Sequence, residues 1–176
     1  DEAKILIDAG QSSAVVSNLS LLGTVPSSLD LAIVSHGHYD HTGGLYPVLQ
    51  HAKKELPVYA HPGIFTPRFS TSGGIRQYIG VPYTRDQLTS LGARWKFVEE
   101  PFRLTEHLWI SGSVPRITGY EQGDTRLVTC CGDGDCQDPI QDDMSIYYVR
   151  GREMVVIGGC THSGLVNTVK HGFAIT

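Results

Sequence analysis

A short apolar run followed by a cluster of histidines restricts the fold of this chain more than any other part of its sequence. Leu31–Val34 is unbroken and apolar, as in a buried strand. Residues 35–41, Ser-His-Gly-His-Tyr-Asp-His, hold three of the eight histidines. Gly43 and Gly44 then predict a tight turn, and apolar residues recur at helical spacing over 45–52. The histidines are therefore expected at the carboxyl end of a strand, where open α/β folds place their sites.

The histidine run predicts a two-metal site. Imidazole and carboxylate groups are ligands of zinc, manganese and iron. Side chains two residues apart on an extended segment point the same way, so His36 and His38 can reach one ion. Where the chain turns, Asp40 and His41 can reach a second ion. The alternative is a surface cluster without a ligand role, but this set of residue types favours a metalloenzyme.

The composition is that of one ordinary globular domain. The 176 residues are 40% hydrophobic and 18% charged. A net charge of -4 gives no reason to expect nucleic acid or a membrane as partner, and no apolar stretch is long enough for a membrane span. We therefore expect a small-molecule substrate and a cytoplasmic location.

The four cysteines form no C-x-x-C pair. Cys130 and Cys131 are adjacent, which is poor geometry for bridging each other. The pattern predicts reduced thiols, in keeping with an intracellular chain.

A βαβα opening followed by several strands predicts layered α/β structure. Strands are expected at 4–7, 31–34, 57–60, 95–98, 108–111, 145–149 and 154–157, and helices at 15–22, 45–54, 85–91 and from residue 167. Residues 63–83 are rich in Gly, Pro, Ser and Thr, which predicts an irregular insertion or lid over the site. The acidic stretch 133–138 fails the calcium-loop pattern at its sixth and twelfth positions and is expected to be a solvated loop.

Five stretches of the sequence resemble a known family. Residues 36–44, His-Gly-His-Tyr-Asp-His-Thr-Gly-Gly, preceded by Ile-Asp-Ala-Gly at 7–10, resemble the signature of the metallo-β-lactamase superfamily. Three more stretches resemble its 7,8-dihydropterin-6-methyl-4-(β-D-ribofuranosyl)aminobenzene-5′-phosphate synthase-like branch: 111–116 with Glu121 beyond, 142–145, and 159–167. The resemblance covers nearly the whole chain. It implies an αββα sandwich with the metal site at one edge of the two sheets.

The sequence departs from the superfamily pattern in two places. The pattern has strands ahead of the strand that ends at Asp8, and a further histidine ligand in a strand beyond the last helix. His171 lies inside that helix and does not match this ligand. We therefore expect residues 1–176 to be a single metallo-β-lactamase-like domain that is incomplete at both ends and is a portion of a longer chain.

Three residues outside the histidine run are expected to complete the metal site. His162 follows a predicted strand in a glycine-flanked turn and is interpreted as a ligand of the ion held by His36 and His38. Cys160 is either a thiolate ligand or a small buried apolar residue. Asp143 occupies a place where many superfamily members carry a histidine ligand, so it is either a carboxylate ligand or a solvated residue flanking a strand.

Four further residues are candidates around the metals. The resemblance gives Asp8 the role of orienting the histidine loop by hydrogen bonds, against the alternative of an ordinary turn aspartate. Arg116 offers a fork suited to phosphate and, with Glu121, is a candidate for substrate binding. His61 begins the irregular insertion and is a third candidate for the substrate pocket.

The expected cofactor is a pair of divalent ions, zinc first, with manganese and iron as alternatives. The leading hypothesis is a hydrolase in which a metal-bound hydroxide attacks a phosphoryl or carbonyl centre and Asp40 orients it or takes its proton. The resemblance implies an alternative, a transferase that joins a dihydropterin pyrophosphate to an aminobenzene ribosyl phosphate. A di-iron redox protein is the third hypothesis, but such relatives carry a glutamate between the two histidines, where this chain has only Gly37.

Overall fold

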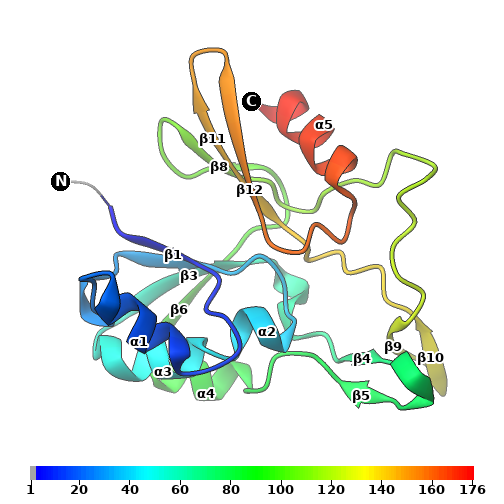
Figure 1. Cartoon of the computed structure of the whole chain (residues 1–176), viewed down its shortest axis with the longest axis horizontal. Coiled ribbons are helices and arrows are strands. Elements are labelled where there is room, and N and C mark those ends of the chain that lie inside the picture. The colour runs from blue at the N-terminus through cyan, green and yellow to red at the C-terminus, as the bar shows by residue number, and fades with distance from the viewer. Residues whose placement is uncertain (1–2) are drawn as a thin grey trace.

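The computed structural model describes residues 3–176 and has two central sheets with helices on both outer sides (Figure 1). The first sheet is wholly parallel, in the order β1-β2-β3-β6. Its strands are β1 (Ile5–Ile7), β2 (Leu31–Ile33), β3 (Leu56–Ala60) and β6 (Ala93–Phe97). Parallel strands end at the same edge, so the loops that follow them lie close together.

Three helices cover one face of the parallel sheet. They are α1 (Ala14–Leu21), α3 (Leu45–Ala52) and α4 (Arg85–Ser90). Val48 and Leu49 of α3 and Leu88 of α4 are fully buried in the core beneath them. This apolar stripe at helical spacing is what attaches the helices to the sheet.

The second sheet is antiparallel, in the order β12-β11-β8-β7. Its strands are β7 (Phe102–Arg103), β8 (Leu108–Ile110), β11 (Ser145–Arg150) and β12 (Glu153–Gly158). Ile146 of β11 packs with Ile33 and Ile110 between the two sheets. The next residue, Tyr147, points the other way and donates its hydroxyl to the Thr168 carbonyl of α5 (Leu165–Ile175), at 2.8 Å. The alternation along β11 thus produces the predicted αββα order of layers.

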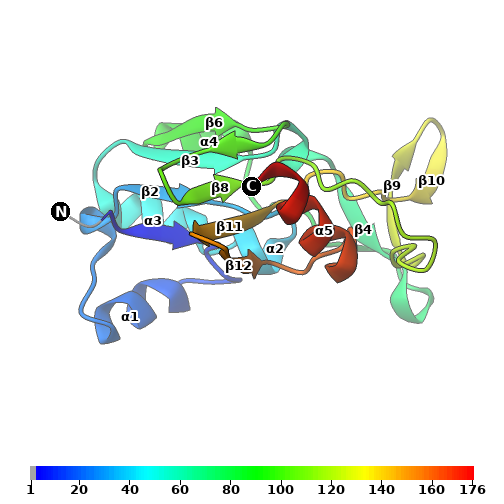
Figure 2. The ribbon, with the colours of Figure 1, turned by 90° about the horizontal axis from the view of Figure 1, so that it is seen from above.

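A third, smaller sheet projects from one end of the sandwich (Figures 1 and 2). Its order is β10-β9-β4-β5, and all its strands are antiparallel. They are β4 (Arg68–Ser70), β5 (Gln77–Tyr78), β9 (Leu127–Cys131) and β10 (Gly134–Gln137). Two predictions are wrong here, because residues 63–83 contribute two strands and the acidic stretch 133–138 contains one. These strands are short and pair with distant segments, so no local periodicity marks them.

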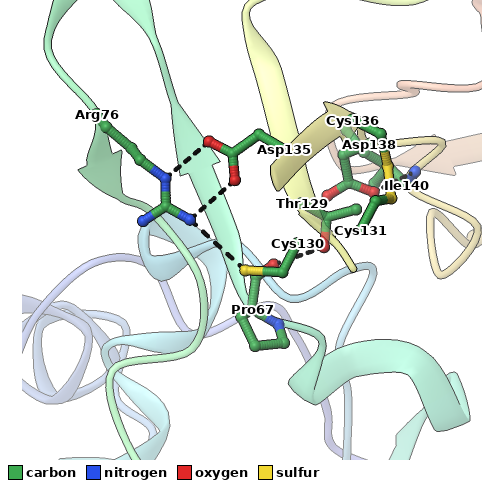
Figure 3. The surroundings of a disulfide bond; sticks show 9 residues. All are labelled: Pro67, Arg76, Thr129, Cys130, Cys131, Asp135, Cys136, Asp138 and Ile140. Carbon is green, nitrogen blue, oxygen red and sulfur yellow. Dashed lines mark hydrogen bonds and ion pairs between the residues drawn. A yellow bond between two sulfur atoms is a disulfide. The ribbon is translucent and has the colours of Figure 1, made fainter. Parts of the chain in front are cut away.

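The prediction of reduced thiols is wrong for two cysteines. Cys131 and Cys136 form a disulfide across the β9–β10 hairpin (Figure 3). Cys130 is free and exposed, and it faces the other side of the hairpin, where Arg76 donates to its sulfur at 3.5 Å and to Asp135. Successive residues of a strand point to opposite faces, so Cys130 and Cys131 cannot bridge each other. Cys131 instead shares a face of the hairpin with Cys136 and pairs with it.

The histidine run leaves β2 and enters one helical turn, α2 (Tyr39–Thr42), before α3 begins. The remaining short turns are η1 (Pro26–Ser28), η2 (Pro62–Phe65) and η3 (Ser72–Gly74). Gly43 and Gly44 both have ordinary right-handed backbone angles, so a tight turn does not explain them. A Cβ atom on Gly43 would collide with the Gln11 carbonyl, and one on Gly44 with the Ala9 carbonyl. The glycines therefore allow the start of α3 to lie against the loop after β1.

Candidate metal centre

Loops from both central sheets bring the predicted ligands together. The loop after β2 carries His36 and His38, and the helical turn α2 that follows carries Asp40 and His41. The loop after β12 carries Cys160 and His162, and Asp143 lies just before β11. Segments more than 100 residues apart in the chain thus meet at one edge of the sandwich.

Three histidines form the first group of candidate ligands. His36, His38 and His162 each offer a ring nitrogen, and these nitrogens lie within 4.8 Å of one another. Nε2 of His36 lies 3.0 Å from Nδ1 of His38. Two nitrogens bound at zinc distance to one tetrahedral ion are about 3.3 Å apart. The spacing of this pair therefore suits a shared ion.

Unpaired polar atoms give a test of whether this group suits a metal. Among residues 3–176, three buried side-chain atoms lack a hydrogen-bond partner: His38 Nε2, Asp143 Oδ1 and His162 Nε2. Buried polar atoms are almost always paired, and an orphan calls for an explanation such as an ion. All three belong to predicted ligand residues, so the donor set fits a divalent cation.

His41 and Cys160 form a second group with His36. The three offer ligand atoms within 4.8 Å of one another. Nε2 of His41 lies 3.1 Å from Sγ of Cys160 and 3.7 Å from Oδ2 of Asp40. Nitrogen, sulfur and carboxylate donors of this kind are suited to zinc or iron. Asp40 is half exposed at 49%, so its carboxylate also faces solvent.

Asp8 supports a histidine of each group, bonding His41 directly and His36 through Ser35. Its Oδ2 lies 2.7 Å from Nδ1 of His41 and accepts the Ser35 hydroxyl at 2.7 Å, while Oδ1 accepts the Ser35 N–H. Ser35 Oγ lies 3.0 Å from Nδ1 of His36. A carboxylate bonded to the distal nitrogen of a ligand histidine fixes the tautomer and orientation of its ring. Ser35, which sequence reasoning missed, extends this support to His36.

The histidines differ in their affinity for protons. Burial, reinforced by the neighbouring histidines, lowers the pKa of His36 and lowers that of His38 to about 3. Burial also lowers the pKa of His162. Burial opposes protonation of His41 too, but the hydrogen bond and charge of Asp8 outweigh it and raise its pKa. Neutral imidazole is the form that binds metal, so the first group is poised as ligand.

Two residues of the centre have a left-handed backbone. Asp8 has φ of 56° and Thr161, between Cys160 and His162, has φ of 49°. Aspartate tolerates this region, but for a β-branched residue such as threonine it is strained. Strain of this kind is maintained only where the surrounding structure enforces it, and it is frequent at functional sites.

One of the three candidate substrate residues, Arg116, lines a cavity of about 330 Å³. Its walls include Ser113, Arg116 and Ser163. Ser163 donates its N–H to Asp143, and Ser113 Oγ lies 2.9 Å from Nε2 of His61. The cavity therefore adjoins the loop of His162 and brings Arg116 and His61 to its neighbourhood.

Glu121 lies at the start of α5 and does not line this cavity. Its carboxylate accepts the N–H groups of Val166 and Asn167 at 2.9 and 3.0 Å, and the Thr118 hydroxyl. Although burial acts in the other direction, these bonds lower the pKa of Glu121. The side chain caps the first turn of α5, and its predicted contact with substrate stays a prediction.

A buried ion-pair cluster beneath the histidine loop also escaped the sequence analysis. Arg68 of β4 donates to both oxygens of Asp142, at 2.8 and 2.5 Å, and to Asp138 at 2.9 Å. Asp142 also accepts the N–H of Gly37 at 2.8 Å. The only local signal was two adjacent aspartates before a strand, which does not reveal an arginine 74 residues away.

Another cavity, of about 730 Å³, has aromatic walls that include Phe65, Tyr78, Tyr83 and Phe97. Its lining contains no predicted ligand from the described part of the chain.

Among residues 3–176, no helix combines the length and the apolar character that crossing a membrane requires.

Comparison with known proteins identifies relatives over almost the full sequence. The chain is 29% identical to the 7,8-dihydropterin-6-methyl-4-(β-D-ribofuranosyl)-aminobenzene-5′-phosphate synthase of Methanocaldococcus jannaschii, over 98% of this chain and 60% of that protein. It is 32% identical to the uncharacterized protein MJ0448 of the same organism, over 96% of this chain and 62% of that protein. The chain thus spans about three-fifths of the length of these curated relatives.

A solved structure shares the fold. Tm1679, described as a metal-dependent hydrolase of the β-lactamase superfamily, superposes with a TM-score of 0.81 at 21% identity, covering 98% of this chain and 62% of the other. This similarity confirms the predicted fold class, and the relatives' names agree with the prediction of an enzyme.

The family model of the metallo-β-lactamase superfamily matches residues 1–136, which include β1, the whole histidine run and the small sheet except the last residue of β10. With this match the resemblance drawn from the histidine run is confirmed, and the chain belongs to the metallo-β-lactamase superfamily.

Proposed function

We propose that residues 1–176 form one metallo-β-lactamase-like domain of a metal-dependent hydrolase with a dinuclear centre, acting on a small phosphorylated substrate. The observation that carries this proposal is the set of buried, unpaired atoms on His38, Asp143 and His162. His36, His38, His162 and Asp143 are assigned to one ion. His41, Asp40 and Cys160 are assigned to the other.

Divalent ions, when bound, lower the pKa of a water ligand and offset negative charge on a phosphoryl or carbonyl oxygen. The protein's own contribution is to keep His36 and His38 neutral through burial and to orient His41 through its hydrogen bond to Asp8. Asp40, half exposed beside His41, is assigned the acceptance of a proton at Oδ2. Arg116 on the wall of the adjoining cavity is assigned to a phosphate oxygen of the substrate.

Metal content and its dependence on the ligands test the proposal. We expect about two zinc ions per purified chain. His36→Ala combined with His38→Ala should remove at least one ion and abolish hydrolysis of phosphodiester substrates. His51→Ala with His107→Ala is the matched control, because both of these histidines are exposed and outside the site. Metal-free wild-type protein, or full metal content in the ligand double variant, would contradict the assignment.

A transferase is the second candidate, favoured by the synthase relative. In that case the centre would assist the departure of pyrophosphate from a dihydropterin pyrophosphate as an aminobenzene ribosyl phosphate attacks. The distinguishing measurement is pyrophosphate release with and without the amine partner. Release only when the amine is present supports the transferase, and release in water alone supports the hydrolase.

The di-iron redox alternative gains no support from the histidine loop. A Cβ atom on Gly37 would collide with the Ile64 carbonyl and approach Nη1 of Arg68 to 2.6 Å. There is no space for a side chain at this position, so Gly37 cannot be replaced by glutamate in this loop.

A further inference from the structure

The Arg68 cluster lies directly under the peptide that joins two proposed metal ligands. Gly37, between His36 and His38, donates its N–H to Oδ2 of Asp142 at 2.8 Å. The same oxygen accepts Nη1 of Arg68, also at 2.8 Å. The direction of one peptide between the two histidines is thus set by a single buried ion pair.

The cluster is almost completely removed from solvent. Arg68, Asp138 and Asp142 are 2%, 6% and 1% exposed. Arginine binds Asp142 through two parallel hydrogen bonds, a geometry that fixes both partners more firmly than a single contact. Its third contact, to Asp138, ties it to the end of the β9–β10 hairpin.

Gly37 packs closely against the chain beneath the histidine loop. Any Cβ atom at this position would collide with the Ile64 carbonyl, so the loop is already in close contact with the chain beneath it.

We propose that Arg68 and Asp142 are positioning residues, which hold the Gly37 peptide so that His36 and His38 converge on one ion. This inference rests on the proposed metal centre. It gives the small projecting sheet a function, because β4 supplies the arginine that supports the ligand loop. Neither residue is assigned a contact with metal or substrate.

The test compares Arg68→Gln, Arg68→Lys and Asp142→Asn with wild type, using Zn²⁺ affinity by chelator competition and the visible spectrum of the Co²⁺ form. We expect Arg68→Gln and Asp142→Asn to lower Zn²⁺ affinity about 10- to 100-fold and to shift the Co²⁺ bands. Arg68→Lys should restore part of the loss, because lysine keeps the charge but not the paired hydrogen bonds. Arg76→Gln is the control, since Arg76 forms an exposed ion pair in the same sheet.

Each result has a distinct meaning. Wild-type affinity and unchanged Co²⁺ spectra in folded Arg68→Gln and Asp142→Asn would overturn the inference while leaving the metal centre intact. Wild-type protein that binds neither metal would instead contradict the proposed function. If Arg68→Gln does not fold, the nearly isosteric Asp142→Asn decides. If neither folds without metal, the cluster supports the fold as a whole and the inference is overturned.

Discussion

At the scale of single residues, Asp8 shows how one side chain can control both halves of a site. It bonds His41 directly and reaches His36 through Ser35. The carboxylate has only acceptors, so it requires Nδ1 of His41 to carry the proton. That leaves Nε2 of His41, the nitrogen that faces Cys160, with a lone pair for a metal.

Asp8→Asn is predicted to weaken binding of the second ion. The amide group keeps the shape, and asparagine tolerates the left-handed backbone at this position equally well. Its NH₂ would face either Nδ1 of His41 and the Ser35 hydroxyl, which favours the wrong tautomer, or the Ser35 N–H, which is itself a donor. We expect metal affinity to fall about 10- to 100-fold at one of two sites, measured by titration calorimetry. Asp30→Asn, an exposed substitution outside the centre, should change nothing; two wild-type affinities in Asp8→Asn would refute the role.

The convergence of the histidines was predictable because their spacing is local. His36, His38 and His41 follow one strand within six residues, and strand geometry alone indicates that two of them converge. Arg68 and Asp142 were not predictable in the same way. Their contact spans 74 residues, and an isolated arginine in a polar segment gives no sign of its partner.

At the scale of elements, α5 depends on a side chain from outside its own sequence. Gly164 precedes the helix and provides no capping side chain, and no acidic residue lies in the first turn. Glu121 supplies the capping side chain and the negative charge, because its carboxylate accepts the N–H groups of Val166 and Asn167. The close fit is visible at Gly164, where a Cβ atom would collide with Glu121.

Glu121→Gln is predicted to loosen the start of α5. One amide oxygen cannot replace two carboxylate oxygens, and the negative charge at the helix N-terminus is lost. Amide exchange at Val166 and Asn167 should accelerate on the order of tenfold, and the melting temperature should fall. Exposed Glu100→Gln is the control. A raised KM with unchanged exchange and melting would instead favour the contact with substrate that the sequence suggested.

Elements with strong local patterns were predicted, and those without them were not. The strands of the two central sheets carry apolar runs and appear within a few residues of their expected places. The exception there is β7, which has only two residues. The strands of the small sheet have two to five residues and include glycine, aspartate and cysteine. Pairing with remote partners, a disulfide and the Asp138–Arg68 contact stabilise them, and none of these is visible locally.

At the scale of the whole molecule, the candidate centre joins the two sheets. His36, His38 and His41 follow the parallel sheet, whereas Cys160 and His162 follow the antiparallel one. An ion held by both groups closes a loop of more than 100 residues and binds only the folded chain. The free energy of unfolding should therefore depend on the metal concentration, and on pH because protons bind the same histidines.

Without metal, the free energy of unfolding is predicted to fall as the pH is lowered from 7.5 to 5.5. The pKa values of His36, His38 and His162 are lowered in the folded chain, so below 6.5 the unfolded chain binds more protons. Each such histidine contributes a slope of at most about 1.4 kcal/mol per pH unit. His41, whose pKa is raised, acts in the opposite direction.

Urea unfolding of the chelated protein at several pH values measures this slope. His38→Gln should make it shallower, because one proton-binding difference is removed, while His107→Gln, at an exposed position, should not. A wild-type stability that is constant or rises toward pH 5.5 would contradict the prediction.

In the β9–β10 hairpin, the disulfide lies between the tip of the hairpin and Asp138, the residue that contacts Arg68 beneath the histidine loop. Gly132 and Gly134 have open space around them, and the Cys131–Cys136 disulfide closes the hairpin immediately behind. Asp138, which holds Arg68, lies on the other side of that bridge from the tip. The turn is therefore the natural place to insert an affinity tag or a fluorophore, since the cross-link prevents a displaced tip from pulling on the chain that supports the ligands.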